Sequence, residues 1–219
     1  MTPEFVFPAG ETAEKLKAFC ESGIAGAEIY TLLCVSGGSL PEGRLFAGEE
    51  NGKTVSALYR GPDYTVIKEA RKPPVEGLAL LRFAGTKSRR SAVPAEPMAF
   101  SDLYAAALLY AGGSLSYADE RRYVYKARCF RDGFYRGACV KVDGKIVCTA
   151  AVVAENRDTC LIGDVFTRED CRGRGYASAC VLFCVYDAEK RGKAPYVLCE
   201  EKNVPFYGAL GFIKTDGAM

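Results

Sequence analysis

One segment, from Cys171 to Ser178, constrains the fold of this chain more than any other. It contains Arg172-Gly173-Arg174-Gly175 and joins a strand-like run, Cys160–Phe166, to a helix-like run, Ala179–Glu189. Two glycines at such a junction let backbone N–H groups converge, and the N-terminus of the following helix adds partial positive charge. The segment predicts an α/β arrangement with a phosphate or pyrophosphate site here, although a plain connecting turn can have the same composition.

The residues that follow continue the alternation of strands and helices. Gly192, flanked by basic residues, is typical of a helix C-terminus. Pro195–Glu200 then has the composition of a strand. Asn203 can cap a short helix with Pro205 in its first turn, and Gly211 is placed to end that helix before a further strand.

Two motifs in this half resemble those of the GNAT superfamily of acyl-CoA N-acyltransferases. Arg172 to Ala177 fits the (Gln/Arg)-x-x-Gly-x-(Gly/Ala) motif of that superfamily. Asn203, Tyr207 and Gly211-Phe212 are similar to the closing motif of the same domain. The resemblance covers residues 98–219, and the first half of the chain lacks these motifs.

The resemblance implies a fold and an activity. The fold is an α/β GNAT fold, a central mixed and mostly antiparallel sheet flanked by helices, in residues 98–219, with an N-terminal α+β domain in residues 1–92. The activity is an N-acetyltransferase that moves an acetyl group from acetyl-CoA, as co-substrate, to a primary amine by direct attack, with no metal. The acceptor would be a small-molecule amine or a peptide N-terminus, and a homodimer is left open. The alternative is a non-catalytic binding or regulatory module that responds to acyl-CoA.

The same resemblance assigns residues to coenzyme A. The backbone from 172 to 177 would anchor the pyrophosphate, and the preceding strand would lie beside the pantetheine arm where the sheet splays. Arg174 is open between a phosphate contact and a solvated side chain. The expected cofactor-binding residues are Val165, Phe166, Thr167, Arg172, Gly173, Arg174, Gly175, Tyr176, Ala177, Ser178 and Asn203.

Three residues are candidates for catalysis. The resemblance places Tyr207 to protonate the departing thiolate, and the alternative is an aromatic that only packs beside Phe206 and Phe212. Asp164 and Glu200 are the carboxylates nearest the expected active-site strands, and either could accept the proton of the amine. The chain has no histidine, which excludes catalytic schemes that depend on a histidine acid or base.

Composition excludes several other classes. The 29 basic and 27 acidic residues give a net charge of +2, which offers no electrostatic reason to expect nucleic acid. No apolar run of about 20 residues and no secretory signal occur, so a cytoplasmic protein away from membranes is expected. Ten cysteines without a Cys-x-x-Cys pair argue against zinc and are expected to be free and buried. A Rossmann fold is disfavoured because Ser178 stands at the third glycine position of its fingerprint.

The N-terminal half contains one segment that resembles the C-terminal half. Asn51-Gly52-Lys53-Thr54-Val55 matches Asp143-Gly144-Lys145-Ile146-Val147 at three positions, and both predict hairpins. The match indicates either a duplication, with a degenerate GNAT-like first half, or the shared chemistry of such turns. Residues 24–35 are ambiguous between helix and strand, residues 78–83 predict a strand, and the polar segment 86–97 is the expected domain boundary. Because the chain ends soon after Lys214, the last strand of the domain is expected to be missing, very short or supplied by the first half.

Overall fold

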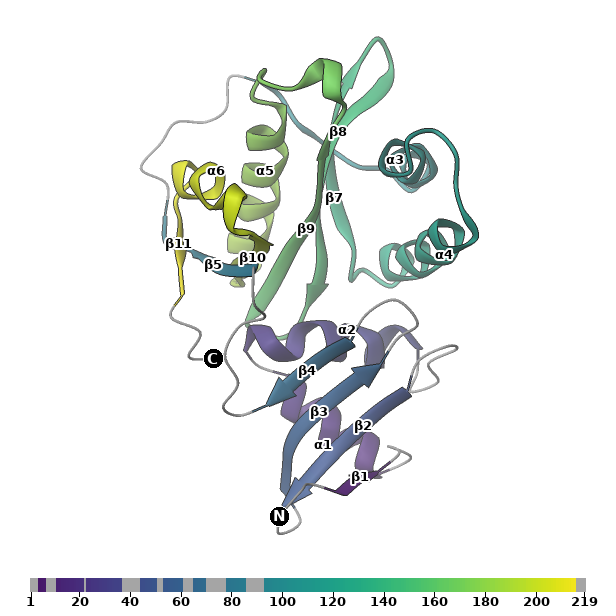
Figure 1. Ribbon diagram of the computed structural model, residues 1–219, viewed down its shortest axis with the longest axis vertical. Helices are drawn as coiled ribbons and strands as arrows, with labels where there is room; N and C mark the ends of the chain where they lie inside the picture. Colours follow the sequence, from purple (N-terminus) through teal and green to yellow (C-terminus); the bar gives the residue numbers. More distant parts are fainter. Residues whose placement is uncertain are drawn as a thin grey trace.

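The structure, a computed structural model, describes residues 4–6, 11–21, 23–36, 44–50, 53–60, 65–69, 78–85 and 93–215. These residues form two sheets with helices packed on them (Figure 1). The smaller sheet has the order β1-β2-β3-β4, and the larger has the order β11-β5-β10-β9-β8-β7-β6.

The N-terminal half pairs a four-stranded antiparallel sheet with two helices (Figure 1). The ambiguous segment is a helix, α2, and it is apolar all round because it is buried on two sides. Ile29 and Leu33 pack within the N-terminal half, whereas Ile24 and Ala27 pack against the larger sheet. The elements are β1 (Glu4–Val6), α1 (Glu11–Cys20), α2 (Ile24–Ser36), β2 (Arg44–Glu50), β3 (Lys53–Arg60) and β4 (Thr65–Glu69).

The C-terminal half confirms the expected mixed α/β fold. Helices α3 and α4 lie on one side of the larger sheet and α5 and α6 on the other (Figure 1). Within this sheet only β9 and β10 pair in parallel. The elements are β6 (Glu96–Pro97), α3 (Asp102–Tyr110), α4 (Tyr117–Arg131), β7 (Arg136–Val142), β8 (Lys145–Glu155), β9 (Thr159–Thr167), α5 (Tyr176–Lys190), β10 (Ala194–Glu200), α6 (Val204–Ala209) and β11 (Phe212–Lys214), with 3-10 turns at Glu169–Cys171 and Glu201–Asn203.

A strand from the first half of the chain completes this sheet. Strand β5 (Leu78–Phe83) lies between β10 and β11 and is antiparallel to both. Leu81 is fully buried in the core that α5 covers. β5 lies on the N-terminal side of the expected boundary, yet it belongs to the larger sheet. Strand β11 is three residues long, and it joins the sheet through its pairing with β5 from the first half.

The two halves repeat one arrangement of elements. Each runs strand, helix, helix and three strands, with the four strands in sequential order in the sheet. The two hairpins also share their register, including a shift of one residue at the same place. After the first pairs, Glu50↔Lys53 and Val142↔Lys145, the first strand moves back two residues while the second advances three, to Gly48↔Ser56 and Val140↔Cys148. Asn51-Gly52 lies outside the described residues, whereas Asp143 and Gly144 have φ of 50° and 72°, as a tight hairpin turn requires.

Hydrogen bonds at the β8–β9 turn connect the two halves. The Asn156 amide donates to the carbonyl oxygens of Cys20, at 3.2 Å, and Gly23, at 2.8 Å. The Thr31 hydroxyl donates to the Glu155 carbonyl and accepts from the Glu155 N–H. These bonds are buried or partly buried, so separating the halves would leave polar groups without partners.

All ten cysteines are free, and nine of them are buried. This confirms the expectation of free, buried thiols. Among the described helices, none has the length and apolar character needed to cross a membrane.

Candidate active site

The larger sheet opens between its two parallel strands. Pairs between β9 and β10 run from Thr159↔Ala194 to Ile162↔Val197 and then stop. Strand β9 continues to Thr167 and stays paired with β8 on its other edge. The backbone groups of residues 163–167 that face β10 therefore have no strand partner in the described structure. Such groups can bind an extended ligand that lies along β9.

A β-bulge in β9 lies at this opening. Between the pairs Thr149↔Phe166 and Ala151↔Gly163, β8 advances by two residues whereas β9 spans three, so β9 contains one extra residue. The bulge contains Asp164, whose φ of 50° is left-handed. Asp and Asn adopt this conformation more readily than most residues. The Thr149 hydroxyl, which donates to the Asp164 carbonyl at 3.0 Å, holds the bulge in place.

The glycine-rich loop brings unpaired N–H groups to the same edge. Gly173 and Gly175 have φ of 75° and 78°, and Gly175 is the N-cap of α5. In the described part of the chain, the N–H groups from Gly173 to Ser178 have no hydrogen-bond acceptor. Converging N–H groups at a helix N-terminus suit a phosphate or pyrophosphate. This geometry meets the requirement of the expected pyrophosphate site.

A groove of about 510 Å³ joins the loop, the β9 edge and α6. All the expected cofactor-binding residues except Arg174 line it. Its lining is Val165, Phe166, Thr167, Cys171, Arg172, Gly173, Gly175, Tyr176, Ala177, Ser178, Asn203, Phe206 and Tyr207.

The two arginines of the loop differ. The Arg172 guanidinium donates to the Thr167 carbonyl at 3.3 Å and lines the groove. Arg174 is exposed, donates to the Asp170 carbonyl at 3.3 Å and is not part of the groove wall. Asn203 occupies the N-cap position of α6, but its side chain makes no capping hydrogen bond and lines the groove instead. The expected N-cap position of Asn203 is therefore confirmed, whereas its side chain makes no capping hydrogen bond.

Tyr207 is buried at the α6 side of the groove. Its ring contacts those of Phe206, with centroids 4.9 Å apart, and Phe212, at 5.7 Å. Burial raises the pKa of its hydroxyl to about 12, so the hydroxyl carries its proton at neutral pH. Tyr207 is thus both a packing aromatic and a protonated group at the groove.

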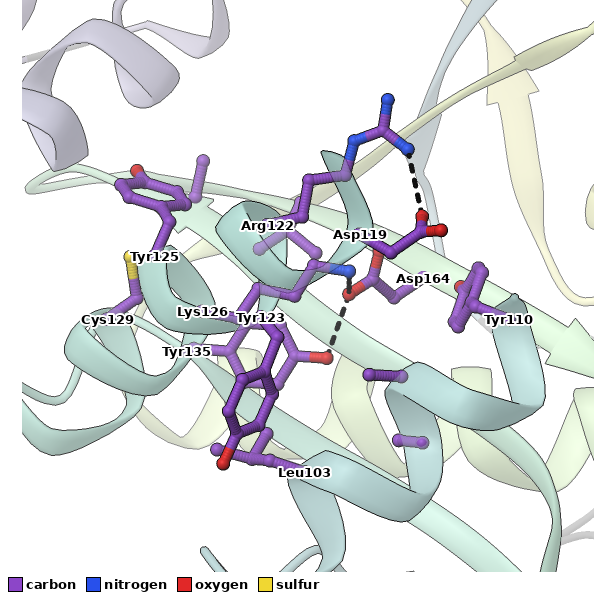
Figure 2. Close-up of a pocket in the computed structure, with 14 residues that line it drawn as sticks. Leu103, Tyr110, Asp119, Arg122, Tyr123, Tyr125, Lys126, Cys129, Tyr135 and Asp164 are labelled. Carbon is purple, nitrogen blue, oxygen red and sulfur yellow. Dashed lines mark hydrogen bonds and ion pairs between the residues drawn. The ribbon is translucent and has the colours of Figure 1, made fainter. Parts of the chain in front are cut away.

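Asp164 faces a second cavity, of about 430 Å³, between α3, α4 and the sheet. Figure 2 shows its carboxylate receiving a hydrogen bond from the Tyr135 hydroxyl, at 2.9 Å, with the Lys126 ammonium 2.7 Å away. Glu200 is exposed at the end of β10, pairs with Lys202 at 2.5 Å and lines neither the groove nor this cavity. The structure therefore brings Asp164, and not Glu200, to a cavity.

Sequence reasoning missed the residues around Asp164. Tyr110, at the end of α3, contacts Phe166 of the groove, with ring centroids 5.2 Å apart. The Lys126 ammonium lies 5.1 Å from the Tyr110 ring centroid. Burial, followed by the Asp164 charge, raises the pKa of Tyr135 well above its usual value. No motif marks these residues, because only the packing of α3 and α4 on the sheet brings them together.

The two ends of α5 provide a matched test of the loop. Gly175, before α5, and Gly192, after it, have φ of 78° and 71°, and a Cβ at either would meet no atom within 4 Å. Valine at either position should cost about 1–2 kcal/mol of stability through backbone strain. Only Gly175→Val should weaken coenzyme A binding, by about tenfold or more in calorimetry. Equal affinities for the two folded variants would show that the loop is only a connector.

Comparison with known proteins agrees with this geometry. The profile of the "Acetyltransferase (GNAT) family" matches residues 100–212. A GNAT-family acetyltransferase from Colwellia psychrerythraea is 12% identical, with 98% of this chain and 97% of that chain covered and a TM-score of 0.65. A GCN5-related N-acetyltransferase-like protein from Streptococcus suis is 16% identical, with coverages of 93% and 96% and a TM-score of 0.53.

A GNAT-family structure from Novosphingobium aromaticivorans is 18% identical and has a TM-score of 0.51. The alignment covers 67% of this chain and 66% of that one. No curated protein matches the chain. The structural similarities show the shared fold, and the profile spans more than half of the sequence. The chain therefore belongs to the GNAT acetyltransferase family.

Proposed function

We propose that this protein is an acyl-CoA-dependent N-acyltransferase that moves the acetyl group of acetyl-CoA to a primary amine. One observation carries the proposal: the free edge of β9, the unpaired N–H groups of the glycine-rich loop and Tyr207 all border one groove. Family membership supports the same activity, because GNAT proteins use acetyl-CoA.

The groove offers a place for each part of the co-substrate. The N–H groups from Gly173 to Ser178 would bind the pyrophosphate. The unpaired backbone of Val165 to Thr167 would hydrogen-bond the amides of the pantetheine arm. Asn203, whose side chain is not used in capping α6, would contact the same arm from the opposite wall.

The proposed reaction is a direct transfer. The neutral amine nitrogen attacks the thioester carbonyl carbon, so that a C–N bond forms and the C–S bond breaks. An acceptor that binds as an ammonium ion first loses one proton to water. As the neutral amine attacks, a second proton passes from its nitrogen to Asp164, directly or through water, and the departing thiolate takes a proton from Tyr207. Exchange with water then removes the proton from Asp164 and restores that of Tyr207. The products are the N-acetylated amine and coenzyme A.

We also propose that residues 4–69 are a degenerate, GNAT-like duplicate of the first part of the C-terminal domain. The repeated element order and hairpin register support this proposal. The sequence after β4 lacks a second loop with paired glycines, so this copy would not bind coenzyme A in the same way.

Tyr207→Phe tests the proposed acid. Phenylalanine keeps the ring packing and removes the hydroxyl, so we expect kcat to fall by about 10²-fold while the KM for acetyl-CoA changes little. The loss should persist at every pH below about 12, because burial raises the pKa of Tyr207 to about 12. Initial rates of thiol release across pH provide the measurement. A rate equal to that of the wild type at all pH values would show that Tyr207 only packs and does not protonate the thiolate.

Asp164→Asn and Glu200→Gln together test the proposed base. Asparagine tolerates the left-handed backbone of Asp164, so the bulge should survive while the proton acceptor is lost. We expect kcat/KM for the amine to fall by about 10²-fold in Asp164→Asn. Glu200→Gln should change it by less than about twofold, because Glu200 is exposed. The opposite pattern would assign the base to Glu200.

A further inference from the structure

The cavity beside Asp164 is built for a small organic molecule. Its volume of about 430 Å³ lies within the range of about 300–1,000 Å³ typical of small-molecule sites. Leu103 and Ala106 of α3 and Val153 and Ala154 of β8 give it apolar walls. The remaining uncharged lining residues are Ala107, Tyr110, Tyr123, Tyr125, Cys129 and Tyr135 (Figure 2).

The cavity adjoins the proposed acyl-CoA groove. Asp164 lines the cavity, while its chain neighbours Val165 and Phe166 line the groove. Tyr110 lines the cavity and contacts Phe166 of the groove. A molecule bound beside Asp164 is therefore next to the β9 edge along which the acyl chain would lie.

The charged side chains of the cavity are matched in pairs. Lys126 lies 2.7 Å from Asp164, and Arg122 lies 3.6 Å from Asp119 (Figure 2). Each cation that lines the cavity thus already has a carboxylate partner in it. A carboxylate or phosphate placed beside Lys126 would have to displace the Asp164 carboxylate, whose side chain is only 16% exposed, and a charge buried without a partner is costly. The Arg122 side chain is 57% exposed, so its pair with Asp119 is a surface contact that contributes little to binding in the cavity.

Lys126 shows how an ammonium fits here. Its Nζ lies against the Asp164 carboxylate and 5.1 Å from the Tyr110 ring centroid. A carboxylate together with an aromatic face is a favourable environment for an ammonium ion. The Lys126 side chain is 29% exposed and reaches the site from α4, so it can turn outward without leaving its helix.

We infer that the acceptor is a primary amine on an uncharged, apolar or aromatic body, and that its amino group takes the place beside Asp164 that the Lys126 ammonium fills. This inference rests on the proposed acetyltransferase function and names its substrate class. The body would lie among the tyrosine rings and the apolar walls. Lys126 is a specificity residue, because a cationic acceptor competes with it for Asp164.

Amines that differ by a carboxylate in place of a hydrogen atom or a methyl group provide the test. The wild-type protein is assayed with acetyl-CoA and either 2-phenylethylamine or phenylalanine, and then with hexylamine or 6-aminohexanoate. We expect kcat/KM to be at least about tenfold higher for 2-phenylethylamine than for phenylalanine, and for hexylamine than for 6-aminohexanoate. The reason is that the lysine and the arginine that line the cavity are already paired with carboxylates of the protein. Equal or reversed preference overturns the inference, and so does binding of acetyl-CoA without turnover of any of the four amines.

Two Lys126 variants test the competing ammonium. Lys126→Met keeps an apolar stem and removes the charge, so the KM for 2-phenylethylamine should fall by about threefold or more. Lys126→Arg keeps a cation beside Asp164, so this gain should be absent. A raised or unchanged KM in a folded Lys126→Met protein overturns the role of Lys126.

Different results would contradict the acetyltransferase function and the acceptor class. Absence of acetyl-CoA binding in calorimetry removes the acetyltransferase function and, with it, the acceptor assignment. Binding of acetyl-CoA with turnover that favours phenylalanine or 6-aminohexanoate leaves the acetyltransferase function in place and overturns only the acceptor class.

Discussion

The extra residue that bulges at Asp164 in β9 is the constraint on which the rest of the site depends. A regular β9 would continue its parallel pairing with β10 and close the sheet. The bulge instead coincides with the end of that pairing at Ile162↔Val197 and leaves the β9 edge open. It also places the Asp164 carboxylate beside Tyr135 and Lys126. One backbone irregularity thus serves both the groove and the cavity.

The left-handed backbone of Asp164 is held in place by contacts with its neighbours. The conformation costs about 1–2 kcal/mol for an ordinary residue. Here Thr149 bonds the Asp164 carbonyl, and Tyr135 and Lys126 bind its carboxylate. Strain held in place by several contacts is common at functional sites. Strand β5 lies in the same sheet, between β10 and β11, although it comes from the first half of the chain.

The sequence predicted those parts of the protein whose determinants are local. Gly173 and Gly175 are needed for their own positive φ, so the loop could be inferred from composition, although α5 begins at Tyr176 and not at the expected Ala179. The same holds for the Asp143-Gly144 turn. Strand β5 was predicted as a strand, but its partners lie more than a hundred residues away and no local pattern indicates them. The helix α2 was ambiguous because burial on two faces removes the periodicity that identifies a helix.

The residues of the site likewise include some that local sequence identifies and some that only the tertiary packing brings together. The groove residues follow one another along β9 and the loop, so the motif identified them together. Asp164 and Glu200 looked equivalent at the ends of neighbouring strands, and only the bulge and the packing of α4 distinguish them. Tyr110, Lys126 and Tyr135 carry no motif, because their roles arise from the docking of α3 and α4 on the sheet.

Calorimetric titration of the intact protein with acetyl-CoA is the most direct test of this account. The open β9 edge and the unpaired loop N–H groups predict one site per chain, competed by coenzyme A, with a dissociation constant between about 1 μM and 1 mM, the usual range of substrate affinities. The absence of any heat of binding at millimolar acetyl-CoA would contradict it.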